Sequence, residues 1–221
     1  MAIIRREVNF RVLTSAELRP WKDVATAVVG DALNRSQCMA AAIKPIKPGL
    51  RVLGQARTVQ TIVGDNSAVH AAIALVRPGE VLAIDAGGHV DTAIWGEVMM
   101  VSAQSREIGA VVLDGAVRDA AKMCEMNFTI FARGVVPRGP HKGFGGTIDG
   151  PISVGGVAVQ PGDLLIGDDD GVAVVRLAAV DTVLREVQRI EMREKQMLDL
   201  IRAGKSSAEV VGITIPAVTN D

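Results

Sequence analysis

The feature that most constrains this fold is an arginine–aspartate pair set between an apolar run and a short helical segment. Residues 108–113 are typical of a buried strand, and residues 120–126 have the composition of a short helix. Arg118 and Asp119 therefore lie where a strand gives way to a helix. Open α/β sheets bind their ligands at this point, outside the carboxyl ends of the strands. The pattern predicts an α/β fold with a ligand site at that edge of the sheet.

The chemistry of this pair suits an anion and a cation at one site. The planar guanidinium of Arg118 matches a carboxylate or phosphate, and the Asp119 carboxylate is a hard ligand for a divalent cation. A second acid, Glu97, precedes Arg118 with twenty residues between them, and Gly96 leaves room for a ligand close to the backbone. The alternative is a helix cap beside a surface cation, and the residues alone leave it open.

Length and composition favour one compact unit. The chain has 221 residues and 48% hydrophobic content, which suffices for a single domain with a sizeable core. We expect that domain to span residues 1–221. It would consist of an N-terminal helical segment (1–50), an α/β core (51–176) and a C-terminal helix (177–205).

Charge, apolar runs and cysteine content restrict the partners and the compartment. The net charge is −1 and Lys and Arg are not clustered, so no nucleic-acid partner is expected. No apolar run approaches the roughly 20 residues that a membrane span requires. Cys38 and Cys124 are isolated, which favours a reducing, cytoplasmic location.

Residue spacing predicts the main elements of the core. Apolar alternation or short apolar runs indicate strands at residues 52–63, 81–85 and 128–131. Helical spacing indicates helices at residues 21–33, 66–76 and 91–106, the second of them capped by Asn66 or Ser67. Residues 76–85 and 159–168 resemble each other, each with a Pro-Gly turn before a strand that ends in Asp. Either the convergence of two strand-entry turns or pseudo-symmetry within one sheet system would explain this similarity.

A long amphipathic helix is expected over residues 177–203. Its apolar positions recur at helical spacing and its other face is heavily charged. A helix of this length on a small domain often packs against a neighbouring subunit, so we expect an oligomer.

Three other features have simpler structural explanations. The Asp-rich stretch 168–171 lacks the spacing of a calcium loop and suits a tight turn. The glycine-rich stretch 139–146 lacks the ending of a phosphate-binding loop and is expected to be a flexible loop covering the site. Lys122 is a candidate Schiff-base lysine, although no apolar pocket for it is evident in the sequence.

The sequence resembles the RraA-like family and, within it, the class II pyruvate aldolases. The resemblance extends from about Thr26 to Glu194, and its signature is an acid, twenty residues and then Arg-Asp, matched by Glu97, Arg118 and Asp119. Supporting blocks lie at residues 64–66, 76–80, 96–99, 114–119 and 161–171.

The resemblance implies an αββα sandwich core with N-terminal helices and a long C-terminal helix, assembled as a trimer or hexamer, with Mg²⁺ or Mn²⁺. Carried over by position, Asp119 binds the metal and Glu97 supports it through water, while Arg118 contacts the pyruvyl group. The substrate carboxylate is received by the backbone at Gly96, Glu97, Val98 and Met99. Glu194 matches a glutamate that reaches the site of an adjacent subunit.

The implied activity is cleavage of a 4-hydroxy-2-oxo acid to pyruvate and a second 2-oxo acid through a metal-stabilised enolate. The family's alternatives are an oxaloacetate decarboxylase with the same chemistry and a regulator of ribonuclease E, which is shorter and lacks the long helix. Such aldolases often carry Asp and Leu-Leu where this chain has Glu97 and Val98-Met99, which leaves the substrate open. No Rossmann glycine motif supports a methyltransferase, a function with which such homologues are often labelled.

Overall fold

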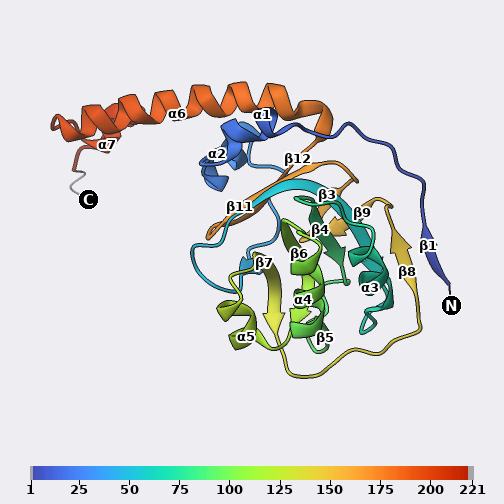
Figure 1. Ribbon diagram of the computed structural model, residues 1–221. Helices are drawn as coiled ribbons and strands as arrows, with labels where there is room; N and C mark the ends of the chain where they lie inside the picture. The colour runs from blue at the N-terminus through green and yellow to red at the C-terminus, as the bar shows by residue number, and fades with distance from the viewer. Residues whose placement is uncertain (1, 219–221) are drawn as a thin grey trace.

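The structure, a computed structural model describing residues 2–218, has four layers in the order helix, sheet, sheet, helix (Figure 1). The first layer consists of α3 (Ser67–Ile73), α4 (Glu97–Ser105) and α5 (Ala120–Glu125). The second is a sheet built on β3 (Val52–Thr61), β4 (Val81–Asp85), β6 (Ala110–Val117) and β7 (Ile130–Val135). The third contains β9 (Ile152–Val154), β10 (Val157–Val159), β11 (Leu164–Asp168) and β12 (Gly171–Val175). The fourth is α2 (Thr26–Ala32) with α6 (Val180–Arg202).

Alternation along the central strands produces this layering. In β4, Leu82 and Ile84 face the helices, whereas Val81 and Ala83 face the second sheet. In β11, Leu165 packs toward the first sheet, and Leu164 and Ile166 pack toward α2 and α6. The mixed α/β fold and the long C-terminal helix are as the sequence predicts.

Strand β3 joins the two sheets. Its first half pairs with β11 in the antiparallel sense, from Val52 to Gln55, and its second half pairs with β4 in the parallel sense, from Ala56 to Gln60. Strands β4, β6 and β7 continue the parallel arrangement. Their carboxyl ends therefore meet at one edge of the sheet, where parallel α/β sheets bind ligands.

The N-terminal segment differs from the helical expectation. It contains two short helices, α1 (Ser15–Leu18) and α2, and the 3₁₀ turn η1 (Arg19–Trp21), but also two edge strands. Strand β1 (Ile3–Arg5) pairs with β8 (Gly146–Ile148), and β2 (Lys44–Pro45) pairs with β7. Strand β2 contains a proline, which an edge strand tolerates because one of its sides needs no partner.

The predicted helix over residues 91–106 begins later than expected. Residues Ala93–Trp95 form β5, which pairs with the end of β6, and α4 begins only at Glu97. The buried side chains of Ile94 and Trp95 suit a strand as well as a helix, so their apolar character alone did not distinguish the two. Strand β6 is correspondingly longer than residues 108–113 and ends at Val117. Glu97 therefore lies at the very start of a helix.

The two Pro-Gly segments form the same local turn. Gly79 and Gly162 both have positive φ, at 80° and 90°, as the third position of a type II turn requires. In each case the following acid accepts a hydrogen bond from the N–H three residues earlier, Glu80 from Arg77 and Asp163 from Gln160.

Helix α6 crosses the end of the molecule away from α4 and α5, and its far half extends beyond the body (Figure 1). The buried residues Val180, Val183 and Val187 lie in its first half, which packs against α2. The short helix α7 (Ser207–Val211) follows at the tip. In the part of the chain that the structure describes, no helix is long and apolar enough to cross a membrane.

Candidate active site

Asp119 stands at the junction between β6 and α5 in an uncommon backbone conformation. Its φ and ψ are 60° and 32°, the left-handed region that non-glycine residues seldom adopt. Its Oδ2 atom accepts a hydrogen bond from the backbone N–H of Glu97 at 3.1 Å. Among the described residues, none donates a hydrogen bond to Oδ1, and the side chain is 39% exposed. The conformation therefore ties Asp119 to the start of α4 and leaves one oxygen free to bind a ligand.

Gly96 allows this close approach. A Cβ atom added at residue 96 would lie 2.7 Å from Asp119 Oδ2 and 3.1 Å from Arg118 Cγ, well inside van der Waals contact. The backbone of Gly96 is extended, so glycine is required here for space and not for its conformational freedom.

Arg118 is held between two glycines. Its backbone N–H donates to the Trp95 carbonyl at 2.9 Å, and its Nε lies 3.6 Å from Asp119 Oδ2. A Cβ atom added to Gly139 would collide with a guanidinium nitrogen of Arg118. A Cβ atom added to Gly96 would lie 3.2 Å from Arg118 Nε. The guanidinium is nevertheless half-exposed and faces open space on both sides, where two pockets share it as a wall.

Glu97 is the first residue of α4 and lies at the mouth of the site. Its Oε1 is 3.8 Å from the Lys122 ammonium; the Lys122 side chain is largely exposed and the Glu97 side chain is about half exposed. A carboxylate is favoured here because the first turn of a helix carries unpaired N–H groups and a partial positive charge. Lys122 is solvated and paired with an acid, which is the opposite of the apolar pocket that a Schiff-base lysine needs.

A small pocket of about 170 Å³ lies beside Arg118. Its lining comprises Asn66, His70, Ile94, Trp95, Gly96, Val98, Met99, Arg118, Pro140 and Lys142. This lining contains two cationic side chains and no carboxylate. Partial burial, followed by the charge of Lys142, lowers the pKa of His70 below its ordinary value of 6.5, so the imidazole is neutral at pH 7.

Three polar residues of this pocket, Asn66, His70 and Lys142, were not among the site residues predicted from the sequence. Asn66 had been expected as a cap for α3, but its amide instead donates to the Ile94 carbonyl at 3.1 Å. Capping falls to Asp65, whose carboxylate accepts the Ser67 N–H at 2.8 Å. The buried Oδ1 of Asn66 has no hydrogen-bond partner among the described residues. His70 and Lys142 are single polar residues, and no local pattern in the sequence marks them.

The glycine-rich loop over residues 139–146 does border the site, as expected, but it is fastened rather than free. The His141 N–H donates to the Gly64 carbonyl at 2.8 Å, and the Gly143 N–H donates to Ser67 Oγ at 2.7 Å. The Phe144 N–H donates to the buried carboxylate of Asp65 at 3.1 Å. These bonds hold the loop against the start of α3.

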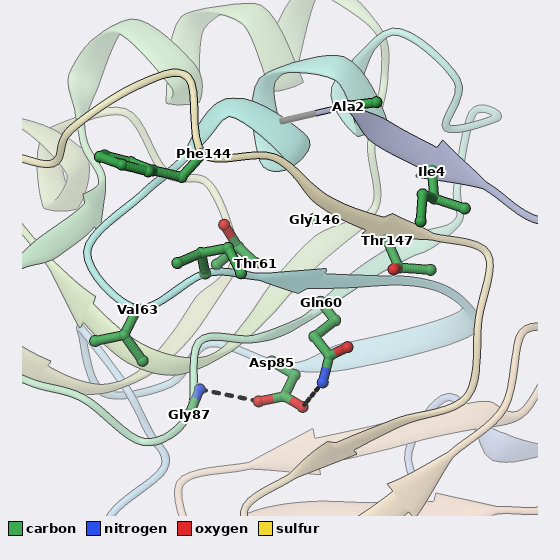
Figure 2. Close-up of a pocket in the computed structure, with 11 residues that line it drawn as sticks. Ala2, Ile4, Gln60, Thr61, Val63, Asp85, Gly87, Phe144, Gly146 and Thr147 are labelled. Carbon is green, nitrogen blue, oxygen red and sulfur yellow. Dashed lines mark hydrogen bonds between the residues drawn. The ribbon is translucent and has the colours of Figure 1, made fainter.

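A larger hollow in the surface, of about 620 Å³, lies elsewhere (Figure 2). Ile4, Val63 and Phe144 contribute exposed apolar walls. The hollow has one acid, Asp85, whose carboxylate already accepts hydrogen bonds from Gly87 and Gln60 (Figure 2). Its open shape and satisfied polar groups offer little for chemistry, so the smaller pocket beside Arg118 is the better candidate.

Two other predictions concern residues far from this pocket. The acidic stretch 168–170 is a tight turn between β11 and β12, as expected. Glu194 is exposed on the far half of α6, away from the site of its own chain. The structure thus brings together Gly96, Glu97, Val98, Met99, Arg118 and Asp119, and leaves Glu194 outside.

Comparison with known proteins shows the family of this chain. A family model described as RraA-like, Aldolase/RraA, matches residues 26–174, which is more than half of the chain. The chain belongs to the RraA-like family. Within that family it is 37% identical, over 193 residues, to a protein of Halalkalibacterium halodurans that carries the provisional name 4-hydroxy-4-methyl-2-oxoglutarate aldolase. The match covers 86% of this chain and 92% of that relative.

Solved structures of other proteins share the architecture. A protein from Pseudomonas syringae pv. tomato superposes with a TM-score of 0.77 at 25% identity, covering 91% of this chain and 99% of its own. The RNA-processing inhibitor RraA from Thermus thermophilis gives a TM-score of 0.63 at 29% identity, covering 69% of this chain and 93% of its own. The family therefore contains both proteins named as aldolases and a protein named as an RNA-processing inhibitor.

The donor set of this RraA-like chain fits one class of metal ion. No group of three or more His, Cys, Asp or Glu side chains in the described residues could enclose a cation. Mg²⁺ does not need such an enclosure, because it commonly keeps several waters and binds through one or two carboxylates plus oxygens of the substrate. The free Oδ1 of Asp119, with Glu97 nearby at the mouth, suits that mode.

Proposed function

We propose that this RraA-like protein is a metal-dependent aldolase that cleaves a 4-hydroxy-2-oxo acid to pyruvate and a second 2-oxo acid. The observation that carries the proposal is the convergence of Asp119, Arg118 and the start of α4, held together by the bond from the Glu97 N–H to Asp119 Oδ2. A regulator that only binds a partner does not need these three features together: an aspartate in a left-handed backbone conformation, an arginine packed between two glycines, and a helix N-terminus with unpaired N–H groups.

The start of α4 would hold the substrate carboxylate. The N–H groups of Val98 and Met99 lie in the first turn, where a helix offers them no carbonyl partner. They therefore remain available for an anion, and the helix dipole favours negative charge at this end. Arg118 would contact the same pyruvyl group from the other side.

Asp119 would hold Mg²⁺ or Mn²⁺, with Glu97 supporting it through water. When bound, such an ion supplies a Lewis acid that polarises the 2-keto oxygen. Arg118 stabilises the negative charge that develops on this oxygen as the C3–C4 bond breaks. Glu97, acting through a water molecule, accepts the proton of the C4 hydroxyl, and the enolate of pyruvate then takes a proton at C3.

Glu194 would complete the site of an adjacent subunit. The positions 180, 183, 187, 190, 194, 197 and 201 of α6 follow the alternating three- and four-residue spacing of a coiled-coil seam. Glu194 is the one charged residue in this seam, and it lies in the half that the rest of the chain leaves exposed. We therefore assign the exposed half to a contact between subunits, with trimers or hexamers as the proposed assembly.

The same residues would also support decarboxylation of oxaloacetate, since that reaction forms the same enolate. A second candidate is a ribonuclease regulator, because an RraA named as an RNA-processing inhibitor shares the fold. The presence of Glu97, Arg118 and Asp119 in one cluster favours an enzyme.

The test is pyruvate release from 4-hydroxy-4-methyl-2-oxoglutarate, 4-carboxy-4-hydroxy-2-oxoadipate and oxaloacetate, with Mg²⁺ and after EDTA. We expect activity that EDTA abolishes and Mg²⁺ or Mn²⁺ restores. Arg118→Lys keeps the charge but loses the planar fork, so its rate should fall by about 100-fold or more. Activity that survives EDTA, or that borohydride traps on a lysine in the presence of pyruvate, would refute the metal-dependent reaction.

A further inference from the structure

A cationic hollow lies at the edge of the sheet opposite to Arg118. Its volume is about 470 Å³, within the range of about 300–1,000 Å³ that is common for small-molecule pockets. Its lining comprises Ser15, Leu18, Arg19, Lys22, Arg51, Leu53 and Gly109. Gly109 directly precedes β6 and Arg118 directly follows it, so this strand separates the hollow from the candidate active site by roughly 23 Å. A ligand in the hollow therefore cannot touch the candidate active site.

One wall of the hollow is a single face of the N-terminal helical turns α1 and η1. Four lining residues recur at helical spacing along these turns, namely Ser15, Leu18, Arg19 and Lys22. The Lys22 N–H donates to the Arg19 carbonyl at 3.2 Å, and side chains three residues apart in a 3₁₀ turn project to the same side. Trp21 is fully buried and fixes η1 to the core. The fold therefore holds the two cations of this wall side by side.

The facing wall comes from the start of β3, where Arg51 and Leu53 lie on the same side of the extended chain. Arg51 Nη2 donates to the Val24 carbonyl at 2.5 Å, and its Nη1 lies 3.8 Å from Asp168 Oδ2. The same Asp168 oxygen accepts the Thr26 N–H at 2.9 Å. Asp168 is thus shared between Arg51 and the start of α2, so the guanidinium is fixed in place while its charge is only partly balanced.

The hollow combines unbalanced positive charge with apolar surface. Its lining contains three cationic side chains and no carboxylate. In the part of the chain that the structure describes, neither Arg19 nor Lys22 has a carboxylate within ion-pair distance. Like charges held close together repel, and an anion between them removes that cost. Leu18 and Leu53 are half-buried in the same lining, so the hollow also offers contact to an apolar group.

We propose that this hollow binds a small organic anion that carries two negative charges on an apolar body. Arg19 and Lys22 contact the charged groups, and Leu18 and Leu53 contact the body. A guanidinium matches a carboxylate and a phosphate equally well, so aromatic dicarboxylates and organic phosphates share the required chemistry. The chain has a net charge of −1 and no wide positive field around these cations, which favours a small anion over an acidic macromolecule. The site goes beyond the proposed function, because it uses neither the metal nor Arg118.

The experiment measures binding of matched anions by isothermal titration at pH 8, in low salt and with EDTA to exclude metal-dependent binding. Phthalate carries two carboxylates on a ring, benzoate keeps the ring with one carboxylate, and maleate keeps the two carboxylates without the ring. The wild-type protein should bind phthalate about 10-fold more tightly than either analogue, because each lacks one of the two required features. Phenyl phosphate identifies the charged group: tighter binding than phthalate assigns the hollow to organic phosphates, and weaker binding assigns it to dicarboxylates.

Variants locate the bound anion. Arg19→Met and Lys22→Met should each weaken phthalate binding by about 5-fold or more and leave Tm unchanged, since both side chains are exposed. Lys142→Met is the matched control, because it removes a cation from the pocket beside Arg118 and should bind phthalate as the wild type does.

The proposal is overturned if the wild-type protein binds neither phthalate nor phenyl phosphate, or if benzoate or maleate binds as tightly as phthalate. It is also overturned if Arg19→Met and Lys22→Met keep the wild-type affinity. An acidic peptide that binds through Arg19 and Lys22, where neither dianion binds, would assign these cations to a macromolecular partner instead. The aldolase reaction is measured separately by pyruvate release, and its failure leaves this binding result unchanged.

Discussion

At the scale of single residues, Asp119 combines an essential charge with a costly backbone conformation. Asn tolerates the left-handed region, so Asp119→Asn should keep the fold and lose metal binding and nearly all turnover. Gly adopts this region without strain, so Asp119→Gly should be equally inactive but more stable by up to about 1 kcal/mol. Thermal unfolding measures the stability of the two variants, and pyruvate release measures their turnover. An active Asp119→Asn variant would disprove the assigned role.

Gly96 should be as sensitive as the charged residues, although it has no side chain. Gly96→Ala pushes a methyl group to 2.7 Å from Asp119 Oδ2, so Arg118 and Asp119 must move apart from α4. Overpacking of this kind costs about 1–3 kcal/mol, and we expect kcat/KM to fall by about 100-fold while the fold persists. The matched control is Gly134→Ala, whose methyl group would meet Val90 at an ordinary 3.4 Å and should leave activity unchanged.

His70 should make the free energy of unfolding depend on pH. Burial and Lys142 lower its pKa in the folded state, whereas the unfolded chain titrates near 6.5. As the pH falls below 6.5, the unfolded state therefore gains a proton more readily, and stability declines until the folded pKa is passed. Urea unfolding between pH 7.5 and 5 should show a shallower decline for His70→Gln. Lys142→Met removes only the charge that lowers the pKa of His70 and leaves its burial unchanged. Its loss of stability with falling pH should therefore be intermediate between those of His70→Gln and the wild type.

At the scale of elements, the sequence predicted the strands and helices whose pattern is local. The apolar run before Arg118 and the amphipathic spacing of α6 are repeated signals, and both elements form there, although β6 extends four residues further than the run, to Val117. The start of α4 was misplaced because Ile94 and Trp95 are buried by pairing with β6, a contact that the local sequence does not contain. Lys142 and His70 were missed for the same reason, since only the fold brings them to Arg118.

The exposed half of α6 provides an element-scale prediction. Ile201 continues the seam of Val180 and Val187, whereas Leu200 points elsewhere, yet the two are similarly exposed at 39% and 40%. Ile201→Glu should therefore weaken subunit association by about 10-fold or more, and Leu200→Glu should not. Light scattering across a dilution series measures this. A wild-type monomer at micromolar concentration, or equal effects of the two variants, would contradict a seam between subunits.

At the scale of the whole molecule, ligand binding should stabilise the fold if the site is an enzyme's. Oxalate resembles the enolate of pyruvate, and a ligand at 100 times its Kd adds about 2.7 kcal/mol to the free energy of unfolding. For a chain of this size, Mg²⁺ with oxalate should raise Tm by about 5–10 °C, and Asp119→Asn should show no such rise. If Mg²⁺ with oxalate does not stabilise the wild type while a ribonuclease E fragment co-purifies with it, the protein is a ribonuclease regulator and not an aldolase.

The shared strand β3 has a consequence for synthesis on the ribosome. Its first half is complete by residue 55, but the partner that covers it, β11, begins only at Leu164. Until then the nascent chain carries an open row of backbone amides, the kind of edge that recruits other unfinished chains. A chain interrupted between residues 142 and 164 would therefore be prone to aggregate even though every residue that lines the pocket beside Arg118, from Asn66 to Lys142, has already been made.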